Sequence, residues 1–315
     1  MRENLNSKYF FTLSYIMKYL YIPAIATLIT IFYSCDYVKL PYPPKIPCDN
    51  DTVACPLPVF PTRVAIKKVL LEDYTGHHCT NCPNAGREAV KLDSIFGEKL
   101  VVMSVHAGGF ARTYPIYSII YSYDFRTTAG DKYNSFFGIA AYPNGMINRI
   151  GFPANNHKKG YTSWSSGIQA VINNAPDADI QIINNYDNTT RKLCVHVQSK
   201  FLKQMTGTYQ LVVVLTEDSI IKPQLDNGVD VLNYVHRHAL RATISCGGEW
   251  GDALAKGSVA NGNTYTKSYL YNMPADFNGL APDITHCAVI AYIYDDDPVS
   301  PTYKQVIQAE EKKID

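Results

Sequence analysis

LLEDYTGHHCTNCP, residues 70–83, is the stretch of sequence that decides the fold of the first half of this chain. An apolar, β-rich run over residues 64–74 predicts a buried strand. Apolar residues at helical spacing follow the cysteines, and Gly97 ends that pattern. Cys79 and Cys82 therefore lie at a strand-to-helix turn, where two intervening residues bring the sulfurs close enough to bond.

The segments after this turn alternate between strand and helix. Strands are predicted over residues 99–105 and 145–150, and helices over residues 128–137 and 161–173. Such alternation is typical of an α/β domain that contains a parallel element. We assign this domain to residues 63–176.

Beyond Pro176 the hydrophobic pattern changes to a period of two. The alternating segments are short and are separated by turns such as Asn261-Gly262-Asn263. The 24 tyrosines and the aromatic content of 12% also suit half-buried strands. The sequence therefore predicts an all-β, immunoglobulin-like sandwich over residues 177–312.

The turn that carries the two cysteines resembles the active-site turn of thioredoxins, and the predicted α/β domain is therefore thioredoxin-like. Amides at the helix terminus favour the thiolate of Cys79, which makes Cys79 the candidate attacking sulfur and Cys82 its resolving partner. The family has a buried acid six positions before the first cysteine, as a proton acceptor, and Asp73 stands there. Pro143 matches the family's cis-proline, which faces the disulfide. His78 replaces the usual tryptophan and could add positive charge beside Cys79.

The same residues admit other interpretations. The cysteine pair could be a static structural disulfide, and Asp73 could be a solvated strand end. A zinc site that includes His77 and His78 is disfavoured because adjacent ligands crowd the metal. Haem attachment requires a histidine directly after the second cysteine, where Pro83 stands. We expect no metal and no cofactor, and an enzymatic activity stays open.

The amino end has the features of an export signal. Residues 20–33 form an apolar run that is too short to span a membrane but fits the core of a signal peptide. Met17 lies shortly before this run, so translation could start there. The run ends in a serine and Cys35, which resembles a bacterial lipobox and implies acylation of Cys35. Residues 1–34 are then a lipoprotein signal peptide, and the proline-rich residues 35–62 are a tether.

Eight cysteines in an exported chain meet an oxidising compartment. Besides the pair at the turn, Cys48 and Cys55 could close a small loop in the tether. Cys194, Cys246 and Cys287 form an odd set, so at least one should be free or paired between molecules. The formal net charge of +1 gives no reason to expect nucleic acid as a partner.

Several features together resemble one family. They are the lipoprotein front, the cysteine turn, and residues 142–149, 233–241 and 305–309. The family is named for a twenty-eight-kilodalton outer-membrane protein of Porphyromonas and is found across the Bacteroidetes. The resemblance implies a lipid-anchored outer-membrane or surface protein of adhesin or receptor type. His236 and His238 lie two residues apart in its specific motif, where a solvent-facing strand explains them better than a metal does.

Two functions from different classes follow from these patterns. In the first, the chain is tethered to the membrane by its lipid and exchanges thiols and disulfides with exported proteins through Cys79 and Cys82. In the second, it is a surface adhesin or receptor that binds a ligand, and the same disulfide only stabilises the fold.

Overall fold

The computed structural model describes residues 55–113 and 119–314 of the chain. The predicted signal peptide, Cys35 and most of the predicted tether lie outside the described residues. The residues that are described belong to one compact unit.

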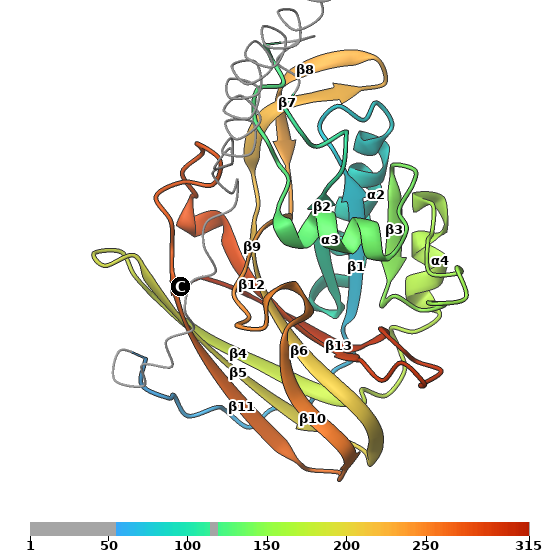
Figure 1. The fold of residues 1–315 in the computed structure, drawn as a ribbon, viewed down its shortest axis with the longest axis vertical. Helices are drawn as coiled ribbons and strands as arrows, with labels where there is room; N and C mark the ends of the chain where they lie inside the picture. The colour runs from blue at the N-terminus through green and yellow to red at the C-terminus, as the bar shows by residue number, and fades with distance from the viewer. Residues whose placement is uncertain (1–54, 114–118, 315) are drawn as a thin grey trace, which may run out of the picture. The chain divides into compact units, whose positions relative to one another are not determined.

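The first half follows the predicted order of strands and helices (Figure 1). β1 (Val69–Thr75) and β2 (Leu100–His106) are parallel, and β3 (Asn144–Ile147) is antiparallel to β1. The helices are α2 (Cys82–Phe96), α3 (Thr128–Phe136) and α4 (Trp164–Gln169). Because α2 crosses from the end of β1 to the start of β2, the two strands can run in the same direction. The carboxyl end of β1 therefore leads directly into the cysteine turn.

Three of these elements are shorter than predicted. β3 ends at Ile147 instead of residue 150. β1 begins at Val69, because the backbone N–H of Lys68 donates to the side chain of Gln308 at 3.1 Å rather than to a neighbouring strand. The helix predicted over residues 161–173 is a 3₁₀ turn at Tyr161–Ser163 followed by the short α4.

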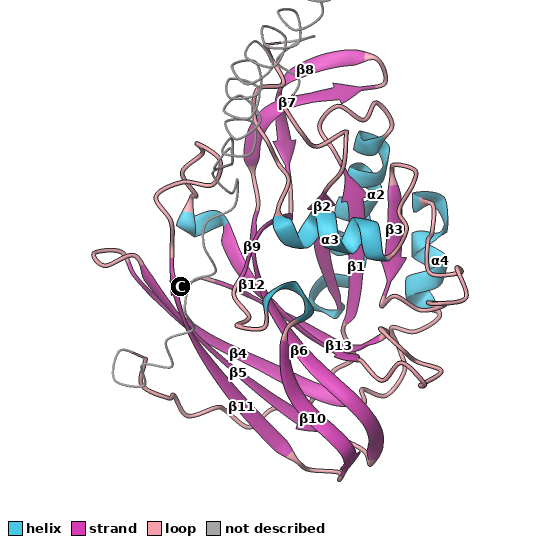
Figure 2. Cartoon of the chain, viewed as in Figure 1, coloured by secondary structure: helices cyan, strands magenta, loops and turns pink. Residues whose placement is uncertain are grey.

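The second half is built from antiparallel strands, coloured magenta in Figure 2. One sheet contains β4 (Ala178–Asp187), β5 (Lys192–Phe201) and β11 (Thr264–Asn272). A second sheet contains β6 (Met205–Glu217), β9 (Ala239–Thr243), β10 (Asp252–Val259), β12 (Cys287–Asp295) and β13 (Val306–Lys313). Apolar side chains from both sheets, among them Val195, Val213 and Val289, pack into one core cluster. β7 (Ile220–Asp226) and β8 (Val229–His236) form a separate hairpin.

The two halves share a sheet and a core. β9 pairs with β6 and also bridges to β2, where Ser104 lies opposite Ala239. This bridge joins the strands of both halves into an eight-stranded sheet. One core cluster contains Met103 from the first half and Val212 from the second. The predicted boundary between residues 176 and 177 falls in the loop between α4 and β4, and independent folding of the two parts stays a prediction.

A buried ion pair connects β1 with the second half. Arg149 and Glu72 have no exposed side-chain surface, and two guanidinium nitrogens donate to the two carboxylate oxygens at 2.8 Å each. Arg149 also donates to the hydroxyl of Tyr292 on β12 at 2.9 Å. Its guanidinium carbon lies 4.8–5.7 Å from the ring centres of Tyr133, Phe137, Tyr292 and Tyr294. The buried charge is therefore paired and surrounded by aromatic faces, which attract a cation.

Candidate functional site

Cys79 and Cys82 form a disulfide at the predicted strand-to-helix turn. Cys82 is the first residue of α2, and Pro83 follows within the first turn, where a missing N–H costs the helix no hydrogen bond. The backbone N–H of Cys82 donates to the carbonyl of Cys79 at 3.2 Å. The sequence pattern therefore placed the pair correctly with respect to both elements.

The two cysteines are covered to the same degree, with exposed fractions of 3% for Cys79 and 2% for Cys82. The cover over Cys79 is the β7–β8 hairpin, which sequence analysis did not place there. The sequence contains no signal for this contact beyond the hairpin turn itself.

Several hydrogen bonds hold the β7–β8 hairpin against the cysteine turn. Leu225 and Asn227 donate their N–H groups to the carbonyls of His77 and Thr80 at 2.8 and 2.9 Å. The side chain of Gln224 donates to the carbonyl of Cys79 at 3.1 Å. Two further contacts, from Gly228 to Thr80 Oγ1 and from Arg87 to Asp226, are 2.8 Å long. A large partner could reach Cys79 only if these contacts opened.

Pro143 lies at the same end of the sheet as the cysteine turn. The Tyr142–Pro143 peptide is cis, as the resemblance to thioredoxins implied. Asn144 pairs with Tyr74 in the antiparallel register of β3 and β1, so Pro143 comes next to Thr75 at the carboxyl end of β1. The hydroxyl of Tyr142 donates to Asn134 on α3, which holds this segment from the other side.

His78 is partly buried beside Cys79. Its ring meets the ring of Tyr121 edge-on, with 4.9 Å between the centroids. Tyr121 belongs to the segment between β2 and α3. His78 therefore packs against that segment.

Asp73 is buried and is not a solvated strand end. Its exposed fraction is 2%, and its Oδ1 atom has no hydrogen-bond partner within the described part of the chain. Burial raises the pKa of the Asp73 carboxyl from 3.8 to about 7. A carboxyl with this pKa can take up or release a proton near neutral pH.

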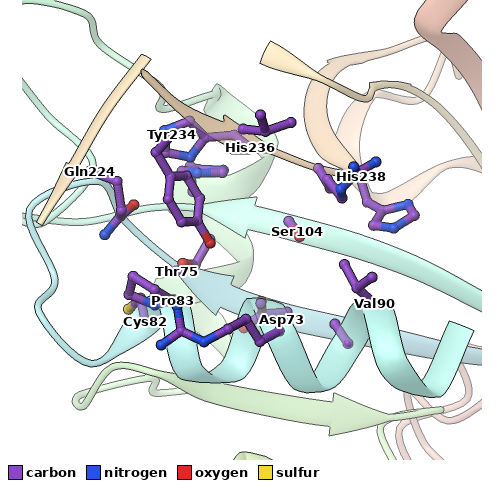
Figure 3. A pocket seen from close by; sticks show the side chains of 16 residues that line it. Asp73, Thr75, Cys82, Pro83, Val90, Ser104, Gln224, Tyr234, His236 and His238 are labelled. Atoms are coloured by element: carbon purple, nitrogen blue, oxygen red, sulfur yellow. The ribbon is translucent and has the colours of Figure 1, made fainter. Parts of the chain in front are cut away.

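Asp73 and Cys82 line the same cavity, which has a volume of about 330 Å³. Figure 3 shows α2, with Pro83 and Val90, on one side of this cavity and Tyr234 of β8 on the other. Among the described residues, Cys82 contributes to the cavity wall and Cys79 does not. The cavity therefore reaches the disulfide from the side that the hairpin tip leaves uncovered.

Two buried histidines, His106 and His236, line this cavity, and a third, His77, lies near them. His236 is 3% exposed, so the prediction that it lies on a solvent-facing strand is wrong. Burial lowers the pKa of His236 to about 3 and that of His77 to about 4, and it also lowers the pKa of His106. The ring of Phe125 packs against all three, with centroid distances of 4.5–5.4 Å. No group of three or more metal-ligating side chains is assembled within residues 55–113 and 119–314.

The other cysteines pair differently from the prediction. Cys55 bonds to Cys194 across 139 residues, so the predicted loop with Cys48 is wrong. This bond ties the segment before β1 to β5. Cys246 is also disulfide-bonded, and Cys287 is a free, buried thiol. The expectation of a free member in the odd set is therefore confirmed.

A comparison with models of protein families shows to which family this chain is related. The model of the family "Outer membrane protein Omp28" matches residues 130–315, which is more than half of the chain. The chain belongs to the Omp28 family. The resemblance drawn from the sequence motifs is thereby confirmed, and this Omp28-family chain is an outer-membrane protein. Among its described residues, no helix has the length and the apolar character needed to cross a membrane.

Solved structures show which fold this Omp28-family chain shares with known proteins. HBP35 of Porphyromonas gingivalis is 17% identical, with a TM-score of 0.58 over 80% of this chain and 77% of that chain. This likeness shows a shared fold. A protein from Agrobacterium tumefaciens is 12% identical over 79% of this chain and 95% of its own, and its TM-score of 0.41 is too low to support an argument. No curated protein matches the chain in sequence.

Proposed function

We propose that this outer-membrane protein exchanges thiols and disulfides through Cys79 and Cys82. The observation that carries the proposal is Asp73, a buried acid that lines the same cavity as Cys82 and whose Oδ1 atom has no hydrogen-bond partner among the described residues. Burying an unpaired carboxyl destabilises a fold, and a purely structural disulfide has no need of one. A disulfide that opens and closes does need a nearby group that accepts and returns a proton.

Each neighbouring group has a role in this proposal. Asp73 takes the proton of an incoming thiol and returns it to a leaving sulfur. The amino end of α2 stabilises a thiolate on Cys79, which lies just before the helix. Pro143 limits the approach to the turn, and His78 orders Tyr121 beside it. In this proposal the first half is a thioredoxin-like domain, and the second half is an immunoglobulin-like sandwich that positions it.

A second candidate function is that of a surface binding protein whose disulfide is static. The observation in its favour is the burial of both cysteines, with Cys79 covered by the β7–β8 hairpin. Cys55–Cys194 provides an example of such a bond in the same chain, because it only ties two distant segments together.

The two candidates differ in how easily glutathione reduces the pair. Redox exchangers have potentials of about −270 to −120 mV, whereas structural disulfides lie below about −300 mV. The measurement is alkylation and peptide mapping of the soluble chain, equilibrated in glutathione buffers of graded potential. We expect Cys79 and Cys82 to become alkylated together while Cys55 and Cys194 stay oxidised. Equal resistance of both disulfides would contradict exchange and favour the binding protein.

We further propose that the chain is anchored by a lipid on Cys35, which lies outside the described residues. The support is the apolar run that ends at Cys35 and the proline-rich sequence that follows it. Metabolic labelling with a fatty acid should label the wild-type protein and leave a Cys35→Ala variant unlabelled. Label that survives in the variant would refute the assignment of the anchor.

A further inference from the structure

The surroundings of the disulfide differ between the side of Cys79 and the side of Cys82. On the side of Cys79, the carbonyls of His77, Cys79 and Thr80 all accept hydrogen bonds from the β7–β8 hairpin. On the side of Cys82, the cavity between α2 and β8 reaches the pair. The hairpin therefore lies over Cys79, and Cys82 is the cysteine that a ligand between α2 and β8 would meet.

We propose, on the basis of the proposed function, that this cavity binds a small polar thiol that reduces the disulfide by attacking Sγ of Cys82. A volume of about 330 Å³ lies at the lower end of the range of small-molecule sites, roughly 300–1,000 Å³. The occupant is thus a free thiol compound with on the order of ten non-hydrogen atoms. A free compound of this size would fill the space, whereas the short side chain of a cysteine on a folded protein would leave most of it empty.

The wall of the cavity offers both apolar contacts and unsatisfied polar groups. Ala89 and Val90 of α2 supply apolar surface. Asp73 Oδ1 and His106 Nδ1 are buried and have no hydrogen-bond partner within residues 55–113 and 119–314. A thiol that carries a polar group would satisfy atoms that the protein leaves unpaired, and an unpaired buried polar atom is costly.

The reaction balances with two molecules of the small thiol. The first gives its proton to the carboxylate of Asp73, and its sulfur bonds to Sγ of Cys82 while the bond to Sγ of Cys79 breaks. Cys79 leaves as a thiolate and takes up the proton from Asp73. The second thiol attacks the sulfur of the first, a small-molecule disulfide departs, and Cys82 is left as a thiol. Two small thiols are oxidised, and the protein disulfide is reduced to two thiols.

The helix favours this direction of attack. Exchange is faster when the departing sulfur is the more stable thiolate. Cys79 lies just before α2, where the helix dipole stabilises a negative charge, whereas Cys82 is already within the helix. Attack on Sγ of Cys82 therefore releases Cys79, which is the better leaving group. Cys82 is also the cysteine that lines the cavity.

The test uses the full chain without its signal peptide, with 2-mercaptoethanol as the small thiol and reduced thioredoxin as a protein dithiol. Brief reaction, alkylation of free thiols and peptide mapping identify the cysteine that carries the first adduct. We expect the adduct on Cys82, alkylated Cys79, and little reduction by the protein dithiol. Adducts found first on Cys79, or a faster reaction with the protein dithiol, would overturn the proposal.

A filled cavity provides the second arm of the test. Val90→Trp places a large ring at the cavity wall, and Ile95→Trp is the matched control, because Ile95 is an exposed residue of the same helix that does not line the cavity. We expect at least about tenfold slower reduction by 2-mercaptoethanol for Val90→Trp, a barrier about 1.4 kcal/mol higher, and an unchanged rate for the control. Val235→Trp, from the opposite wall, repeats the test if Val90→Trp unfolds.

The outcomes separate the two proposals. If 2-mercaptoethanol reduces the pair at equal rates in wild type and both cavity variants, the cavity is not its binding site, and the exchange function stands. If glutathione buffers and 2-mercaptoethanol both leave the pair oxidised in the wild type, the exchange function itself is wrong.

Discussion

Glu72 and Asp73 are neighbours on β1 and are both buried, but their side chains have different surroundings. Consecutive side chains of a strand point to opposite faces of the sheet. Glu72 meets Arg149, which donates to both of its carboxylate oxygens at 2.8 Å. Asp73 faces α2 and the cavity, and its Oδ1 atom has no partner within the described part of the chain.

The difference shows what each face of β1 does. On the Glu72 face, a paired charge joins the two halves, and the ion pair is surrounded by aromatic rings from both. Burial would lower the pKa of Arg149, but the charge of Glu72 and its hydrogen bonds raise it above its ordinary value. On the Asp73 face, the buried Oδ1 atom has no partner among the described residues, which costs stability. The first face serves the fold, and in the proposed function the second serves chemistry.

Breaking the pair on the Glu72 face should have the largest effect. Arg149→Met leaves Glu72 as an unpaired buried charge, so we expect the free energy of unfolding to fall by about 3–5 kcal/mol. Lys91→Met, which breaks an exposed ion pair with Glu88, should change it by less than about 1 kcal/mol. Denaturant unfolding measures both variants, and similar small losses would show that the buried pair does not join the halves.

Asp73→Asn should raise the free energy of unfolding, whereas Arg149→Met lowers it. The unfolded chain ionises Asp73 near pH 3.8 and the folded chain near pH 7, so the folded state holds the proton more tightly. Stability is therefore lost as the pH rises from about 4 to 7 and is not lost further above that. The full loss is about 4 kcal/mol, so at pH 8 the variant should be more stable than wild type by up to that amount.

The comparison of the Asp73→Asn variant at two pH values supplies the control. At pH 4 the two proteins should differ by less than about 1 kcal/mol, because Asp73 is then protonated in the folded wild type and only about half ionised in the unfolded chain. The variant should also be reduced more slowly by small thiols at pH 8, since it lacks the proton acceptor. A stability difference that does not depend on pH would contradict the raised pKa.

The histidines on the Asp73 side should make the protein sensitive to acid. The pKa of His236 is about 3 in the folded chain and 6.5 in the unfolded one, so its contribution to stability is lost as the pH falls below 6.5. At pH 5 the loss is about 2 kcal/mol, which a His236→Phe variant should recover. His286→Phe controls for the loss of an exposed histidine. Unfolding midpoints at pH 5 and 7.5 that change in parallel for all three proteins would refute this assignment.

The smallest effect is expected for the cover over Cys79. Thr80→Ala removes the acceptor of the Gly228 N–H, one hydrogen bond of about 1 kcal/mol. Global stability should hardly change, but amide exchange at Leu225 and Asn227 should become about fivefold faster. Thr266→Ala, on the exposed side of β11, should leave those amides unaffected. Unchanged exchange in Thr80→Ala would mean that this contact does not hold the hairpin.

The local features of the site were predictable from the sequence. The placement of Cys79 and Cys82 at a strand-to-helix turn, the cis peptide at Pro143 and the buried position implied for Asp73 agree with the structure. The roles of these residues and of His78 stay predictions. These features were predictable because a strand end, a helix start and a fixed spacing depend on residues close together in the chain.

The contacts made over long distances were not predictable. The bond between Cys55 and Cys194, the bridge between Ser104 and Ala239, and the hairpin over Cys79 each join distant segments. A period of two shows which residues of a strand face the core, but it does not show which strand lies beside it. The motif over residues 233–241 could be recognised in the sequence, but its position at the cavity wall could not be predicted from the sequence.

The sequence by itself determined that this chain carries a cysteine pair at a helix start, with an acid six positions earlier and a proline that returns to the same sheet edge. The tertiary structure alone decided that the β7–β8 hairpin covers Cys79 and that a cavity reaches Cys82. The physical reason is that reactivity depends on which atoms reach the sulfurs. That access is set by packing between segments more than a hundred residues apart, such as Thr80 and Gly228.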